Sequence, residues 1–160
     1  MSIFALLLAP VALQATPAEP VCIRAGDVPR EFAGWYGAVA GRPQIGAPFM
    51  VTARPRPQLR LVKVADAAHP GGGAVASFLV TRAGTYRIAL SEGAWVDVVR
   101  GRRSAESVAH AHGPICTGMR KIVDFRLTRG AYQLQLSELK AASVKVMIVP
   151  APRVRMIPAR

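Results

Sequence analysis

The chain has 160 residues, 51% of them hydrophobic, which suits one domain with a buried core. Its formal net charge of +12 favours an anionic partner: a lipid surface, an acidic glycan or nucleic acid. Nucleic acid is disfavoured, because the basic clusters lack interleaved aromatic residues and no helix-turn-helix, RRM or zinc-finger pattern occurs.

Residues 1–18 carry no charged side chain, and Ile3 to Leu13 is an apolar run interrupted only by Pro10. This run is too short to cross a bilayer, which takes roughly 20 residues, but it suits the apolar region of a secretory signal. We therefore expect 1–18 to be a signal peptide. The mature chain would be periplasmic or secreted and would have no transmembrane segment. The alternative is an apolar first strand in a cytosolic protein.

Residues 19–47 are predicted to form an N-terminal segment that packs on the main domain. Its apolar residues recur at i, i+3, i+4 and i+7, which predicts a short helix or helical turn between Glu31 and Val39. These residues are Phe32, Trp35, Tyr36 and Val39. Core packing is the commoner use of such a group, although a Trp-Tyr pair can also bind ligands.

One pattern occurs twice, from Phe78 to Ser91 and from Phe125 to Ser137. Each copy has a Phe, a Thr-Arg-Gly turn and then Tyr-x-aliphatic-x-Leu; Ala83 is the one extra residue, in the first copy. Gly suits the turn because it accepts positive φ, and the alternation places one apolar face on a core. Each copy is therefore predicted to be a β-hairpin.

Further strands are predicted around the repeat, and no long helical period separates them. They cover Phe49 to Ala53, Leu59 to Val64, Ala94 to Arg100 and Ser143 to Val149. The resulting fold class is all-β: an antiparallel β-sandwich or jelly roll of about eight strands over residues 48–150. Residues 151–160 read as a basic, Pro-rich tail.

The chain has two cysteines, Cys22 and Cys116. In an oxidising compartment they are most simply one disulfide, and closing a loop of this length could stabilise the fold by about 4–5 kcal/mol. The other interpretations of Cys116 are a free thiol and a metal thiolate.

The stretch from His110 to Cys116 lies between the two repeats and is interpreted as an insertion outside the core. His110 and His112 point to the same side if the chain is extended there, so both imidazoles could bind one transition metal ion. The third ligand would be His69, Cys116 or Asp97. The alternative is a polar loop whose histidines hydrogen-bond to the backbone while Cys116 forms the disulfide.

The basic residues gather in two clusters that could form an anion-binding surface. They are Arg54, Arg56, Arg60 and Lys63 in the first cluster, and Arg100, Arg102 and Arg103 in the second. The alternative is solvated charge on exposed strand faces. Carboxylates are few, and Asp124 is expected to be solvated. Nucleophile-elbow and Walker motifs are missing, so no catalytic residues are assigned.

Two resemblances add expectations. The segment from Phe78 to Val149 resembles the bacterial pre-peptidase C-terminal type of β-sandwich, through Phe78, Gly84, Tyr86, Ile88 and Leu90 and their counterparts in the second copy. This resemblance implies an exported, non-catalytic domain.

The whole chain also looks like a group of small exported bacterial proteins that share Gly93-Ala94-Trp95 and His110-x-His112-Gly113-Pro114-x-Cys116. Members of this group are sometimes labelled homogentisate 1,2-dioxygenase, which implies a cupin with an iron site. The cupin pattern places a Glu soon after His-x-His and a later His. Here Ile115, Cys116 or Thr117 stands at the Glu position, and no His follows His112.

The sequence therefore leaves two hypotheses. In the first, the protein is an exported, non-catalytic envelope module that binds an anionic glycan, lipid surface or envelope protein and needs no cofactor. In the second, it is a cupin-like metal-dependent dioxygenase that uses His110 and His112 with iron or another transition metal.

Overall fold

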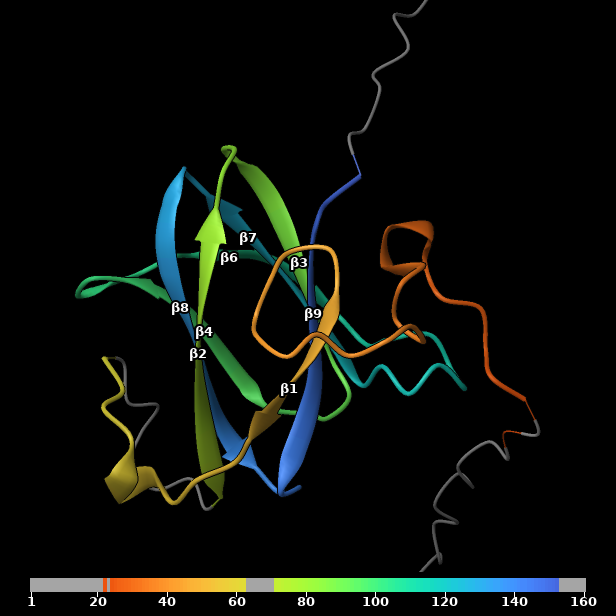
Figure 1. Cartoon of the computed structure of the whole chain (residues 1–160), viewed down its shortest axis with the longest axis horizontal. Coiled ribbons are helices and arrows are strands. Elements are labelled where there is room, and N and C mark those ends of the chain that lie inside the picture. The colour runs from red at the N-terminus through yellow and green to blue at the C-terminus, as the bar shows by residue number, and fades with distance from the viewer. Residues whose placement is uncertain (1–21, 23, 63–70, 153–160) are drawn as a thin grey trace, which may run out of the picture.

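The computed structural model of the chain describes residues 22, 24–62 and 71–152 (Figure 1). These residues form nine strands in two antiparallel sheets, with two short 3₁₀ turns. The predicted all-β, antiparallel sandwich is confirmed. The expected signal peptide at 1–18, His69, Lys63 and nearly all of the basic tail lie outside the described residues.

The first sheet has five strands in the order β1-β9-β3-β7-β6, and the second has four in the order β2-β8-β4-β5. The strands of the first sheet are β1 (Pro48–Thr52), β9 (Ser143–Pro150), β3 (Gly84–Leu90), β7 (Lys121–Leu127) and β6 (Ser107–Ala111). Those of the second are β2 (Gly72–Val80), β8 (Gly130–Leu139), β4 (Trp95–Arg100) and β5 (Arg103–Ser104). Described residues contain no helix with the length and apolarity that a membrane crossing needs.

The main core lies between the two sheets and consists of the alternate apolar residues of facing strands. Its largest fully buried side chains include Phe49, Phe125, Ile88, Leu134 and Ile148. Period-two alternation gives each strand one apolar face, and the two sheets bury these faces against each other. The predicted strands at 49–53, 94–100 and 143–149 are confirmed within one residue at each end.

The two repeats are not hairpins: their strands form where predicted, but the two strands of each repeat do not pair with each other. In the first repeat the chain leaves β2 in one sheet and enters β3 in the other, and in the second it leaves β7 and enters β8 across the same core. We call these two connections arches. β2 pairs with β8 and β3 with β7, so each copy pairs with the other copy. Sequence alternation identifies strands but does not identify their partners.

The N-terminal segment covers the outer face of the five-stranded sheet. In Figure 1 it is the orange trace beside β9, on the side away from β2 and β8. A 3₁₀ turn at Arg30–Phe32 places Phe32 and Trp35 in a second apolar cluster with Ile122, Met147 and others. The helical turn is thus shorter than predicted. Tyr36 and Val39 are each 49% exposed, so only half of the predicted apolar face packs.

Two further predictions are wrong. Residues 59–62 form no strand; they follow a 3₁₀ turn at Arg56–Gln58, because the prolines at 55 and 57 favour a turn over a ladder. Asp124 is not solvated but only 8% exposed. It accepts hydrogen bonds from Arg87 Nε at 3.1 and 3.2 Å, and Arg87 also pairs with Glu31 of the N-terminal segment.

Candidate functional site

The predicted insertion from His110 to Cys116 begins in an edge strand, because its first two residues are the last two of β6. His110 lies in β6, across from Val123 of β7, and His112 follows the end of that strand. Both side chains are exposed, and no hydrogen bond joins either imidazole to another described residue. Thus the backbone-bonded alternative does not describe them, and both rings are available to a ligand.

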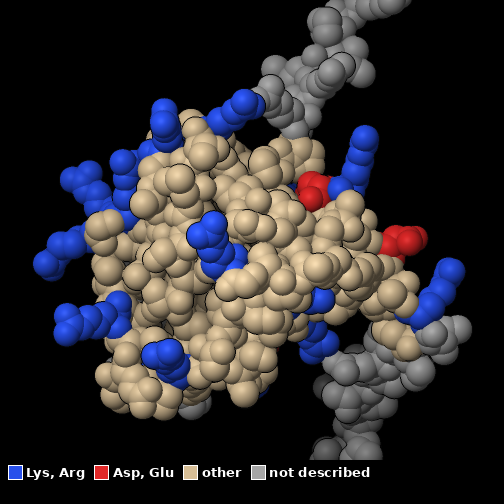
Figure 2. Space-filling view, viewed as in Figure 1, with Lys and Arg blue, Asp and Glu red and all other residues tan. Residues whose placement is uncertain are grey.

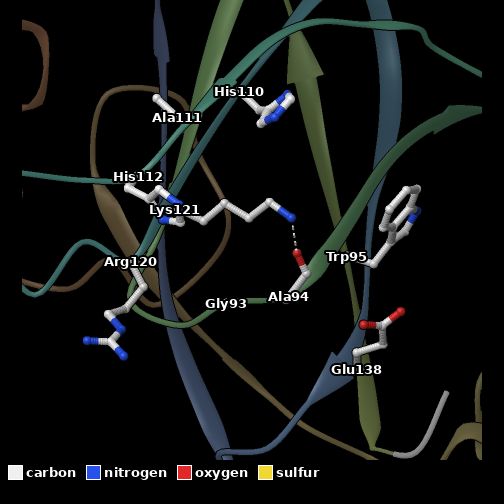
Figure 3. Close-up of a pocket in the computed structure, with 9 residues that line it drawn as sticks. All are labelled: Gly93, Ala94, Trp95, His110, Ala111, His112, Arg120, Lys121 and Glu138. Carbon is white, nitrogen blue, oxygen red and sulfur yellow. Dashed lines mark hydrogen bonds between the residues drawn. The ribbon is translucent and has the colours of Figure 1, made fainter. Parts of the chain in front are cut away.

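His110 and His112 line one pocket of about 550 Å³, within the range of small-molecule sites. Three chain segments complete it: the start of β4, the start of β7 and the end of β8 (Figure 3). They contribute Gly93, Ala94, Trp95, Arg120, Lys121 and Glu138. The pocket is therefore built at one end of the sandwich, where both sheets supply side chains.

Lys121 crosses the middle of this pocket. Its ammonium group donates a 2.6 Å hydrogen bond to the Ala94 carbonyl and lies 5.9 Å from the centre of the Trp95 ring (Figure 3). Burial lowers the pKa of Lys121 below its ordinary value, and the nearby charge of Glu138 offsets only part of that effect. The ammonium is thus a partly desolvated cation beside an aromatic ring.

The pocket does not fit the iron centre that the dioxygenase label implies. Among the described residues, no three His, Cys, Asp or Glu side chains are placed to hold one metal ion. Of the suggested third ligands, Cys116 is bonded to Cys22, Asp97 accepts a hydrogen bond from Ser104 outside the pocket, and His69 lies outside the described residues. The ammonium of Lys121 also occupies the space that Figure 3 shows between the two histidines and Ala94.

The rest of the motif has a structural role. Cys22 and Cys116 form a disulfide with Cα atoms 5.4 Å apart, as predicted. Beside it, the Gly26 N–H donates to the Cys116 carbonyl at 2.7 Å, and the Trp35 indole donates to the Thr117 carbonyl at 2.8 Å. These contacts fasten the N-terminal segment to the turn after His112.

The two predicted basic clusters lie at opposite ends of the sandwich. Arg54 pairs with Gly73 at the start of β2, whereas Arg100 ends β4 near both arches. Arg100 donates to the Thr128 hydroxyl and the Arg129 carbonyl, each at 3.2 Å, so it fastens the β4–β5 turn to the second arch. Arg100 is thus a structural residue, and the six arginines do not form one surface.

Three arginines that the sequence analysis did not select join Arg102 and Arg103 beside the arches. We define the arch-end surface as Arg82, Arg102, Arg103, Arg126 and Arg129. All five side chains are exposed, and no ion pair or hydrogen bond joins any of their guanidinium groups to another described residue. Glu106, between β5 and β6, is an acidic neighbour along the chain. In Figure 2 the Lys and Arg residues crowd the side where Figure 1 shows the arches and the β4–β5 turn, and Asp and Glu appear only on the opposite side.

The spacing of these arginines in the sequence does not predict this surface, because they come from separate parts of the chain: the two arches, the β4–β5 turn with the start of β5, and the end of β7. The repeat itself was the usable signal: it places Thr-Arg in both copies, and paired copies bring both arginines to one end. No sequence pattern marked Arg120 and Lys121 as site residues; they only follow the turn that contains Cys116.

Comparisons with protein-family models, with curated proteins and with solved structures found no match.

Proposed function

We propose that this protein is an exported, non-catalytic module that binds an anionic glycan through the arch-end surface. The observation that carries the proposal is the group of five exposed arginines without partners among the described residues. Guanidinium groups bind carboxylate and sulfate in a bidentate manner. Their placement at the two arches, at the β4–β5 turn and at the end of β7 puts several positive charges at one end of the sandwich, which suits a polymer with repeated charges.

Two features support export. A disulfide persists in oxidising compartments and is rare in the cytosol. The expected signal peptide at 1–18 agrees with this placement. Disulfide mapping and N-terminal sequencing of protein recovered from the periplasm or the medium would test it, because a cytosolic protein would keep residues 1–18 and free thiols.

The glycan proposal is tested with a matched pair of charge variants. The triple variant R102Q/R103Q/R129Q removes three positive charges from the arch-end surface, and R42Q/R54Q/R60Q removes three from elsewhere. Binding to immobilised polygalacturonate is measured for both at rising salt. We expect the first variant to lose about tenfold or more in affinity, from roughly 0.5 kcal/mol per charge, and the second to lose much less.

The wild-type affinity should also fall steeply with salt, since exposed charges are screened within about 8 Å at physiological ionic strength. Equal losses in the two variants would show that net charge, and not this surface, attracts the polymer. Stronger binding to phosphatidylglycerol vesicles than to the glycan would reassign the partner to lipid.

The dioxygenase alternative has its own test. Elemental analysis of untagged protein should find iron, copper or zinc well below one ion per chain. A stoichiometric metal that is lost in a His110→Ala variant would overturn the non-catalytic proposal.

A further inference from the structure

The pocket described above lies at the other end of the sandwich from the arch-end surface. We infer that the pocket of Trp95, Lys121, His110 and His112 binds one residue of an acidic saccharide, with the sugar ring on Trp95 and its carboxylate at Lys121. This inference rests on the proposed function, because it names the sugar class of the same partner and adds a specific subsite.

Trp95 supplies the platform. Trp95 is the first residue of β4 and is 50% exposed, whereas Trp35 is fully buried. The exposed indole keeps apolar surface in contact with water, and a ligand that covers the ring removes this unfavourable contact. The C–H face of a pyranose ring is flat and apolar enough to pack on such a ring. Lys121 keeps its ammonium beside the same indole, so a ligand on Trp95 is adjacent to a positive charge.

Lys121 supplies the charge recognition. An ammonium group has three donors, and the Ala94 carbonyl accepts one. No other hydrogen bond joins the remaining two to a described residue. Since the group is partly desolvated, a carboxylate that reaches it gains more than it would at a fully exposed lysine.

Hydroxyl groups of the sugar find partners on the remaining walls. His110 and His112 each offer a ring nitrogen as donor and another as acceptor when neutral, and Glu138 borders the opposite wall (Figure 3). This mixture of one aromatic face with several polar groups suits a polyhydroxylated ligand. An aromatic carboxylate would place its apolar ring edge against the polar groups of the two histidines and Glu138. It is therefore the less suitable occupant.

The test uses trigalacturonate and its methyl ester, which differ in charge but share every sugar ring. Binding is followed by tryptophan fluorescence, in which the exposed Trp95 should respond, and by calorimetry. We expect the acid to bind and the ester to bind about tenfold more weakly or worse, as the loss of one charge-assisted hydrogen bond predicts. Trp95→Ala should abolish both binding and the fluorescence change.

Lys121→Gln is compared with Arg129→Gln, which removes the same charge from the arch-end surface. The first should weaken trigalacturonate binding about tenfold, and the second less than twofold. Equal binding of acid and ester, or unchanged binding by Trp95→Ala, would overturn the inference, as would binding of 4-hydroxyphenylacetate in preference to the sugar. If trigalacturonate fails while polygalacturonate still binds the arch-end surface, the subsite inference alone is wrong. If the polymer shows no dependence on that surface, the proposed function fails.

Discussion

Phe78 of the first repeat lies directly across the ladder from Tyr132 of the second, and their rings stack with centroids 5.9 Å apart. The reciprocal pair, Tyr86 and Phe125, lies across the other ladder. Each repeat therefore supplies a Phe to one sheet and a Tyr to the other, and neither copy can complete its aromatic pair alone. The core depends on both copies folding together.

Each repeat tyrosine also fastens its own arch, and we expect its hydroxyl to matter to stability. The Tyr86 hydroxyl donates to the Arg82 carbonyl at 2.8 Å, and the Tyr132 hydroxyl accepts from the Thr128 N–H at 3.1 Å. Tyr86→Phe and Tyr132→Phe should each lower the free energy of unfolding by about 1 kcal/mol. Chemical denaturation measures both, and the control is Tyr36→Phe, which removes a solvent-exposed hydroxyl bond to the Gly26 carbonyl and should cost less. No loss in either arch variant would show that water replaces these bonds.

The strands could be predicted from sequence because alternation records which face each strand buries. Their pairing could not, because the same alternating faces fit a hairpin within one sheet and an arch between two. Tyr86 and Phe125, for example, would each face the core in a hairpin or in an arch, so neither residue distinguishes the two arrangements. In the N-terminal segment, the packing of Phe32 and Trp35 was predicted correctly, but that of Tyr36 was not. The helical spacing of apolar residues in the sequence continues past the residue where the helical turn ends.

The candidate site was harder to predict, because its residues meet only after folding. His110 and His112 were recognisable as a pair, but Lys121 reaches them through the β6–β7 pairing and Trp95 through the opposite sheet. The disulfide was predictable because two cysteines allow one pairing. The acidic partner of Arg87 was missed because Asp124 faces the outside of the sandwich, where the N-terminal segment covers it.

The disulfide should be a major contribution to stability. It links residues 94 positions apart and fastens the N-terminal segment over the outer face of the five-stranded sheet. Cys22→Ser should lower the free energy of unfolding by about 2–5 kcal/mol. The matched control is wild-type protein with a reducing agent, which should unfold like the variant. Equal stability of oxidised wild type and variant would contradict the structural role.

Gly113 should tolerate no side chain. A Cβ atom built there would lie 2.3 Å from both the Cβ and the carbonyl oxygen of Met119, which is itself buried. Gly113→Ala should therefore destabilise the fold by about 1–3 kcal/mol through overpacking. Gly41→Ala, where a Cβ would meet nothing within 4 Å, is the control in thermal denaturation. A neutral Gly113→Ala would mean that the turn after His112 moves freely.

The affinity of the pocket for trigalacturonate should fall at alkaline pH. Burial lowers the pKa of Lys121 below its ordinary value of 10.5, whereas a bound carboxylate favours the charged form and raises that pKa. Binding then takes up a proton wherever the free protein has lost it. The affinity should be constant below the pKa of the free protein and fall about tenfold per pH unit above it.

Calorimetry at several pH values measures this slope, and Lys121→Arg separates its cause. Arg stays charged across this range, so the variant should bind with little dependence on alkaline pH. Arg120, Glu138, His110 and His112 also face the pocket and are unchanged in the variant. A slope that persists in Lys121→Arg would therefore show that the titration does not belong to Lys121, and the carboxylate would not be bound there.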